Sequence, residues 1–504
     1  MDIRYKWLLV LLVFGYIACD SDDDASVKEE VVITSGMADF SKYVALGNSL
    51  TAGFTDGALF IAGQENSMAN ILAQQFALAG GGDFTQPLMD DNVGGALLGG
   101  TQVLAPRFFF NGEGPAPLPA VPTTEISNGL TGVFNNMGIP GAKSFHLLAN
   151  GYGNIAGLSV DPAQANPYFV RMASNPNASV LEDAMAQSPT FFSLWIGNND
   201  ILGYATSGGD GSDSITDVTQ FTQAYEGMIM ALTSGNANGV LFNIPNVTSI
   251  PFFTTVPNNA LVLNASQAAS LTGFFQAVAG IVTGNLQLQG VDEATAQMIA
   301  SQYAITFKEG ANRWIIDAPV TQANPLGFKQ MSEEGLLLLT IDRVALEEEG
   351  YGAVALTPEV LQVLGILQMG GTPTQEQALV VLDAVNGIDD RDVLDIEEVM
   401  AINEATEAFN NVIASSAQTA GLAFVDANLL LSQLADTGLQ FDEFLLRDDL
   451  VFGGAFSLDG VHPSARGYAF IANKAIESIN EMYGSNIPIV KAADYPVLYS
   501  ATLQ

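Results

Sequence analysis

Short, mostly apolar runs separated by helical patterns constrain the fold of this chain most strongly. The runs cover residues 42–46, 190–196, 239–244 and 422–425. Runs of this length are typical of strands that are buried on both faces of a sheet. Apolar residues at helical spacing fall between or after them, at residues 67–79, 221–232, 395–417 and 464–479. The alternation predicts an α/β fold built on a doubly wound parallel sheet, which presents its site at the carboxyl ends of the strands.

The alternation stops between residues 251 and 390. Apolar spacing predicts four helices there, at 265–282, 293–303, 358–367 and 375–385, and a hairpin over 305–316. Residues 83–135 are rich in Gly and Pro, so we expect long loops. We interpret the chain as one domain over residues 38–504 that carries a large, mostly helical insertion over about 251–390.

Composition excludes several classes of protein. The chain has 54 acidic and 16 basic residues, and it lacks the cluster of Lys and Arg that nucleic-acid binding requires, so we expect no nucleic-acid partner. Its 29 Phe residues and 48% hydrophobic content argue against a disordered acidic chain. The single cysteine excludes an internal disulfide and a thiolate metal cage.

The N-terminus has the pattern of a secretory signal. Arg4 and Lys6 precede an apolar run over residues 7–18, which is too short to span a bilayer. The run ends at Cys19, and this junction resembles the bacterial lipobox, in which a cysteine is acylated as the signal is cleaved. We therefore expect a signal peptide over 1–18 and a lipidated Cys19 followed by an acidic tether over 19–37. The alternative is an ordinary signal peptide with a cysteine there by chance.

Few residues can serve as a catalytic base, because the chain has two histidines. His462 follows Asp459 by three residues, a spacing that lets the carboxylate orient the imidazole; the alternative is a helix cap or a surface pair. His146 has no such partner, and we interpret it as a structural or pocket-wall residue. Ser49 stands on a turn between an expected strand and helix. It is a candidate nucleophile, and a helix N-cap is the alternative.

Four sequence blocks, in order, resemble the SGNH superfamily of serine esterases and lipases. Residues 47–50 (Gly-Asn-Ser-Leu) resemble its GDSL block, with Asn48 in the place of the usual Asp. Residues 136–142, 197–200 (Gly-Asn-Asn-Asp) and 459–462 (Asp-Gly-Val-His) resemble its second, third and fifth blocks. The resemblance covers about 39–250 and 396–483 and does not describe the insertion.

The resemblance implies a three-layer α/β/α, flavodoxin-like SGNH fold and a serine hydrolase that acts on carboxylic esters, either acyl lipids or fatty esters. Ser49, His462 and Asp459 would form its catalytic triad. Ser49, Gly141 and Asn199 would supply the oxyanion hole, and neither a metal nor a cofactor is expected. A carbohydrate acetylesterase and a non-catalytic surface lipoprotein that binds glycan or lipid are the alternatives.

The expected partners are therefore an ester substrate and, through the lipid anchor, a membrane. The residues after Cys19 resemble the export signals of lipoproteins in the Bacteroidota, which implies an outer-membrane lipoprotein and leaves open which face it occupies. Two aspartate groups, at 210–217 and 389–392, lack the spacing of a calcium loop, so we interpret them as turns or caps. Leu361, Leu364, Leu367 and Met369 are candidates for an acyl-binding wall in the insertion, and core packing explains the same pattern.

Overall fold

The computed structural model describes residues 32–503, except for the side chain of Gln368. The expected signal peptide, Cys19 and most of the acidic tether lie outside these residues. No helix of the described chain combines the length and the apolar character of a membrane span.

Five parallel strands form the central sheet: β1 (Tyr43–Gly47), β6 (Asn136–Gly138), β7 (Phe191–Trp195), β8 (Asn238–Phe242) and β17 (Ala423–Val425). Their order across the sheet is β17-β8-β7-β1-β6, and every neighbouring pair is parallel. β6 lies on one side of β1 and β7 on the other, so the chain reverses its direction across the sheet at β1. Open α/β sheets bind ligands beside such a reversal, at the carboxyl ends of the strands.

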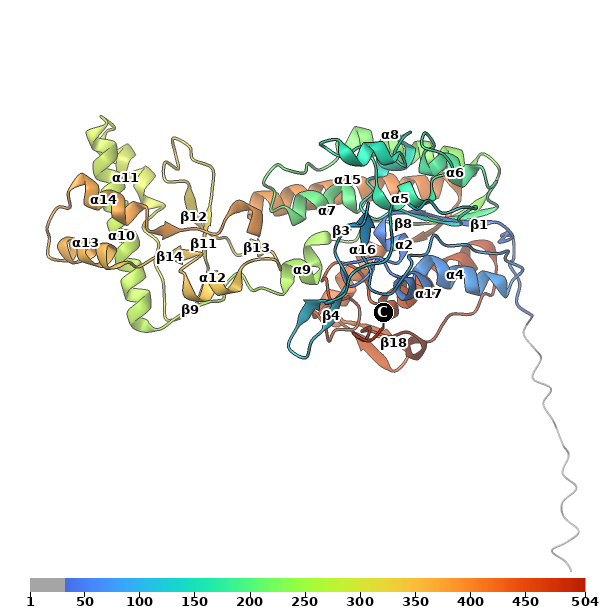
Figure 1. The fold of residues 1–504 in the computed structure, drawn as a ribbon. Helices are drawn as coiled ribbons and strands as arrows, with labels where there is room; N and C mark the ends of the chain where they lie inside the picture. The colour runs from blue at the N-terminus through green and yellow to red at the C-terminus, as the bar shows by residue number, and fades with distance from the viewer. Residues whose placement is uncertain (1–31, 504) are drawn as a thin grey trace, which may run out of the picture. The chain divides into compact units, whose positions relative to one another are not determined.

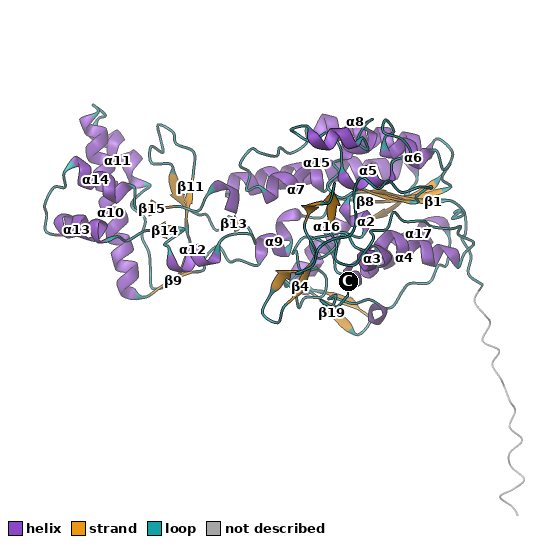
Figure 2. Cartoon of the chain, in the orientation of Figure 1, coloured by secondary structure: helices purple, strands orange, loops and turns teal. Residues whose placement is uncertain are grey.

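Helices cover both faces of this sheet, as the α/β prediction requires. α8 (Val218–Thr233) packs against α15 (Ile396–Ala420), and α4 (Met68–Ala77) packs against α17 (Ala465–Tyr483). Figure 1 shows the two pairs on opposite sides of the strands, and Figure 2 separates the helices from the strands by colour. The two faces share one hydrophobic core.

Caps and aromatic stacking place these helices. The Asp217 carboxylate accepts hydrogen bonds from the first turn of α8, as its sequence predicts. Phe221 of α8 stacks on Phe409 of α15, with ring centroids 4.1 Å apart. Ser464 caps α17, which presents a continuous buried face to the sheet. The expected helices around these apolar patterns are all present.

Shorter elements surround the sheet. The helices are α2 (Ser49–Ala52), α3 (Ile61–Glu65), α5 (Pro167–Met172), α6 (Val180–Met185), α7 (Asn199–Thr206), α9 (Pro251–Thr254) and α16 (Ala427–Thr437). The antiparallel pairs are β2 (Ala96–Leu98) with β3 (Thr101–Leu104), β4 (Phe108–Phe110) with β5 (Pro115–Pro117), and β18 (Leu439–Phe441) with β19 (Phe444–Leu446). Two of these pairs interrupt the loops expected over 83–135.

Residues between β8 and α15 build two further hydrophobic clusters of their own. The helices are α10 (Ala265–Leu288), α11 (Glu293–Ser301), α12 (Arg343–Glu348), α13 (Pro358–Gln368) and α14 (Gln375–Leu382). The strand pairs are β9 (Leu261–Leu263) with β10 (Gly310–Asn312), β11 (Ile315–Asp317) with β12 (Phe328–Gln330), β13 (Leu336–Leu337) with β16 (Val393–Leu394), and β14 (Ala353–Val354) with β15 (Val385–Asn386).

The hairpin expected over residues 305–316 is wrong. β10 and β11 pair with β9 and β12 instead of with each other. The side chain of Asn312 closes the loop before β11 by accepting from the Lys308 N–H and donating to the carbonyls of Lys308 and Gly310. β11 pairs with the nearby β12, whereas β10 pairs with β9, which precedes α10 and α11.

Candidate active site

The turn between β1 and α2 presents Ser49. A Cβ on Gly47, the last residue of β1, would clash with Thr51 and with the Trp195 carbonyl of the neighbouring strand, so the close approach requires glycine. Asn48 then caps α2, because its Oδ1 accepts a hydrogen bond from the Leu50 N–H at 3.0 Å. Ser49 is the first residue of that helix and is largely buried.

His462 meets Ser49 from the other end of the chain. Its Nε2 lies 2.9 Å from Ser49 Oγ, and its Nδ1 lies 2.9 Å from Asp459 Oδ2. The ring of Phe54 packs against the imidazole, with centroids 4.6 Å apart. The three residues expected to act together therefore form one hydrogen-bonded chain, which has the geometry of a serine nucleophile with its base and the group that orients the base.

Asp459 accepts five hydrogen bonds. Oδ1 accepts from the Ser457 hydroxyl and from the backbone N–H groups of Val461 and His462, and Oδ2 accepts from the Gly57 N–H as well as from His462. Burial would raise the pKa of this carboxyl, but the charge of His462 and the hydrogen bonds lower it to about 2. Asp459 is thus held as an anion that can stabilise a positively charged imidazole.

A second carboxyl, Asp56, lies beside this aspartate. It is 1% exposed; its Oδ1 accepts from the Leu458 N–H at 3.0 Å, and its Oδ2 has no hydrogen-bond partner in the described chain. Burial raises its pKa to about 7; the Leu458 hydrogen bond and the charge of Arg107 oppose the shift, and the charge of Asp459 adds to it. The Asp56 backbone N–H also binds the Ser457 hydroxyl that supports Asp459. Asp56 therefore holds its proton up to a higher pH than an exposed aspartate does, and it lies close to the candidate triad.

The backbone offers donors for an oxyanion. The N–H groups of Ser49 and Gly141 have no hydrogen-bond partner within residues 32–503. Gly141 has φ +81, a left-handed conformation, in the turn that follows β6. The Ile139 N–H donates to the Gly47 carbonyl at 2.9 Å, so this turn begins beside the turn that carries Ser49.

Asn199 adds a side-chain donor. Its Nδ2 donates one hydrogen to the Ala142 carbonyl at 2.9 Å, which leaves the second hydrogen for a ligand. The next residue, Asp200, is fully buried and accepts from both the N–H and the hydroxyl of Ser144. The loops after β6 and β7 are therefore joined by adjacent hydrogen bonds.

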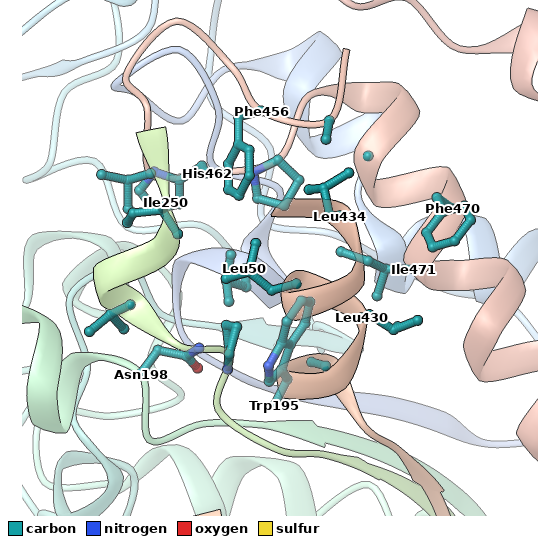
Figure 3. Close-up of a pocket in the computed structure, with 18 of the residues that line it drawn as sticks. Leu50, Trp195, Asn198, Ile250, Leu430, Leu434, Phe456, His462, Phe470 and Ile471 are labelled. Carbon is teal, nitrogen blue, oxygen red and sulfur yellow. The ribbon is translucent and has the colours of Figure 1, made fainter. Parts of the chain in front are cut away.

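Ser49 and His462 open onto a cavity. Asn198 and Asn199 also line it, and the rest of the wall is almost entirely apolar. Trp195 contributes a ring whose N–H is already bonded to the Asn243 carbonyl. Figure 3 shows the cavity between Trp195 and the side chains of α16 and α17. The apolar wall includes Leu50, Val247, Ile250, Leu430, Leu431, Leu434, Leu439, Leu446, Phe456, Phe470 and Ile471.

Other residues that the sequence singled out lie elsewhere. His146 accepts from the Lys143 N–H, stacks on Tyr152, and has a pKa lowered to about 4 by burial and by the charge of Lys143. Asp213 pairs with Lys143 at 2.6 Å, and within residues 32–503 no group of His, Cys, Asp and Glu is placed to hold a metal ion.

The leucines proposed for an acyl wall in the insertion, Leu361, Leu364 and Leu367, line a separate groove with α10. The cavity beside Ser49 uses α16 instead. Its leucines follow the Asp426 cap at helical spacing, so the sequence did carry a signal for this helix. Asp56 had no comparable signal. Asn198 lies within the block at 197–200, but no role was expected for it there.

Searches of protein-family models, of curated proteins and of solved structures each found no match to this chain.

Proposed function

We propose that this protein is a serine hydrolase that cleaves carboxylic esters, with an SGNH-type arrangement of its site. One observation carries the proposal: a hydrogen-bonded chain runs from Ser49 through His462 to Asp459, with 2.9 Å at each step. The sheet order supports it, because a flavodoxin-like sheet places ligands at the strand ends that Ser49 and Asn199 follow.

In the proposed reaction, Ser49 Oγ attacks the ester carbonyl carbon while His462 takes the hydroxyl proton of Ser49. The N–H groups of Ser49 and Gly141 and the Asn199 amide donate to the oxyanion. The alcohol leaves with the proton from His462, and the acyl group stays on Ser49. His462 then takes a proton from water as the water oxygen attacks the acyl carbon, and it returns that proton to Ser49 Oγ as the C–Oγ bond breaks and the acid leaves. Asp459 remains an anion and stabilises the imidazolium in both halves.

The cavity favours an aliphatic acyl group. It adjoins Ser49; its polar residues are Ser49, Asn198, Asn199 and His462, and leucines and aromatic rings form most of the rest. Enclosing an alkyl chain gains roughly 0.8 kcal/mol for each buried CH₂ group, which an acetyl group could not use. Fatty esters or acyl lipids are therefore the leading substrate class.

One feature favours the second candidate, a carbohydrate acetylesterase. A separate crevice follows the ends of β8 and β17, and all nine residues that line it are polar, six of them Asn. Amide groups can both donate to and accept from sugar hydroxyls. Its residues Asn246 and Asn428 are next to Pro245 and Ala427, which line the cavity beside Ser49.

The test is turnover of p-nitrophenyl esters from acetyl to palmitoyl, for the wild-type chain and for Ser49→Ala. We expect the wild type to prefer longer acyl groups and Ser49→Ala to lose turnover. A preference for acetyl supports the second candidate. Absence of turnover across the series would contradict the enzyme and favour a binding protein. The lipid anchor at Cys19 and an outer-membrane location remain part of the proposal.

A further inference from the structure

Asn198 has an unusual position for an asparagine at the start of a helix. It is the N-cap residue of α7, yet its side chain makes no capping hydrogen bond. Its Oδ1 instead accepts from Nδ2 of Asn48 at 3.3 Å. The side chain therefore hydrogen-bonds to the turn that carries Ser49 and does not cap its own helix.

The cap of α2 determines which way both amides point. Asn48 Oδ1 must face the Leu50 N–H that it accepts, so Nδ2 of Asn48 is the end that faces Asn198. A donor at that place requires an acceptor, and an asparagine side chain has one acceptor oxygen. The Oδ1 of Asn198 therefore faces Asn48, and its NH₂ group is directed elsewhere.

That NH₂ group reaches the cavity. It makes no hydrogen bond within residues 32–503, and it is not fully buried. Asn198 lines the same cavity as Ser49, Asn199 and His462, and Figure 3 labels Asn198 and His462 among the residues of its wall. A free amide donor at the polar end of an apolar cavity matches an acceptor oxygen of the substrate.

We propose that Asn198 is a substrate-binding residue whose Nδ2 donates a hydrogen bond to an oxygen of the ester group, and that Asn48 is the positioning residue that aims it. The inference rests on the proposed ester hydrolysis. The proposed role of Asn198 also gives a reason for Asn, in place of Asp, at position 48. An Asp there would still cap α2, but its second oxygen is an acceptor and would turn the Asn198 NH₂ group away from the substrate.

The test is a double-mutant cycle of Asn198→Ala and Asn48→Asp, with kcat and KM measured on one p-nitrophenyl ester. Loss of a hydrogen bond to a group that gains charge predicts a decrease in kcat/KM of ~10- to 100-fold for Asn198→Ala. Asn48→Asp should cause a decrease of similar size while leaving Asn198 in place. In the Asn198→Ala background it should have almost no further effect.

Two results would overturn the proposal. One is wild-type kcat/KM for Asn198→Ala. The other is an equal effect of Asn48→Asp in both backgrounds, which would mean that the new charge acts by itself. Ser49→Ala is measured alongside as a control for the proposed function. If Ser49→Ala is inactive and Asn198→Ala has normal activity, the role of Asn198 is wrong and the proposed function stands. Circular dichroism of each variant shows that it is folded.

Discussion

The buried carboxyl of Asp56 should make the folded protein less stable as the pH rises. Burial raises its pKa to about 7, whereas an exposed aspartate in the unfolded chain titrates near ~3.9. The folded state therefore binds this proton more tightly than the unfolded state does. The stabilisation is fully present below about pH 4 and is lost as the pH rises through about 7.

Asp56→Asn should remove this dependence. An asparagine can still accept the hydrogen bond from the Leu458 N–H through its oxygen. Integrating the proton linkage with these two pKa values gives a loss of about 3 kcal/mol of unfolding free energy in the wild type between about pH 4.5 and about pH 8. The variant should lack that loss, so the difference between the two proteins should grow with pH.

Urea unfolding at both pH values measures the effect. Trp195 lies in the sheet and Trp314 in a separate cluster of the insertion, so both proteins should carry Trp7→Phe and Trp314→Phe to restrict the fluorescence to Trp195. Asp436→Asn, at an exposed position on α16, is the matched control and should leave the pH dependence unchanged. Equal pH dependence of the wild type and Asp56→Asn would refute the reasoning, because it would mean that Asp56 is already ionised in the folded protein.

The site gives four further predictions. Asn199→Ala should lower kcat by roughly 10²- to 10³-fold, because one oxyanion donor is lost, and near-normal kcat would remove Asn199 from the site. Asp459→Asn should lower kcat by on the order of 10⁴-fold with little change in KM, since the imidazole loses the anion that orients it; a loss confined to KM would contradict this role. Leu434→Trp should shift the acyl-length optimum towards shorter p-nitrophenyl esters, while Leu429→Trp, at an exposed position of the same helix, should not; equal optima would exclude α16 from acyl binding. Cys19→Ser should abolish metabolic labelling with palmitate, and persistent labelling would place the lipid elsewhere.

Local signals explain why much of the sheet could be predicted. β7 and β8 are continuous apolar runs, and α8 follows an aspartate that caps it. Both signals come from residues that are neighbours in the sequence, so they can be recognised without the fold. β6 is only Asn136–Gly138, too short and too polar for any periodicity to reveal. The hairpin expected over 305–316 was wrong because β10 pairs with β9 across α10 and α11, and β11 pairs with β12, pairings that the local apolar pattern does not indicate.

Some residues of the candidate site could likewise be predicted from the sequence, and others could not. Motifs at 47–50 and 459–462 predicted that Ser49, Asp459 and His462 would lie together, and the structure brings them together. Asp56 was not predicted, because it lies outside the four blocks and its partner, the Leu458 N–H, is a backbone group that no motif marks. The role inferred for Asn198 depends on the orientation of a neighbouring amide, which no sequence pattern encodes.

The most direct test of Ser49 as the nucleophile is covalent labelling by a serine-directed fluorophosphonate, read by intact mass and by sequencing of the labelled peptide. The proposed mechanism predicts one adduct on the wild-type chain, located at Ser49, and no adduct on Ser49→Ala. An adduct that persists in Ser49→Ala, or a wild-type chain that neither takes the label nor cleaves any ester, would contradict it.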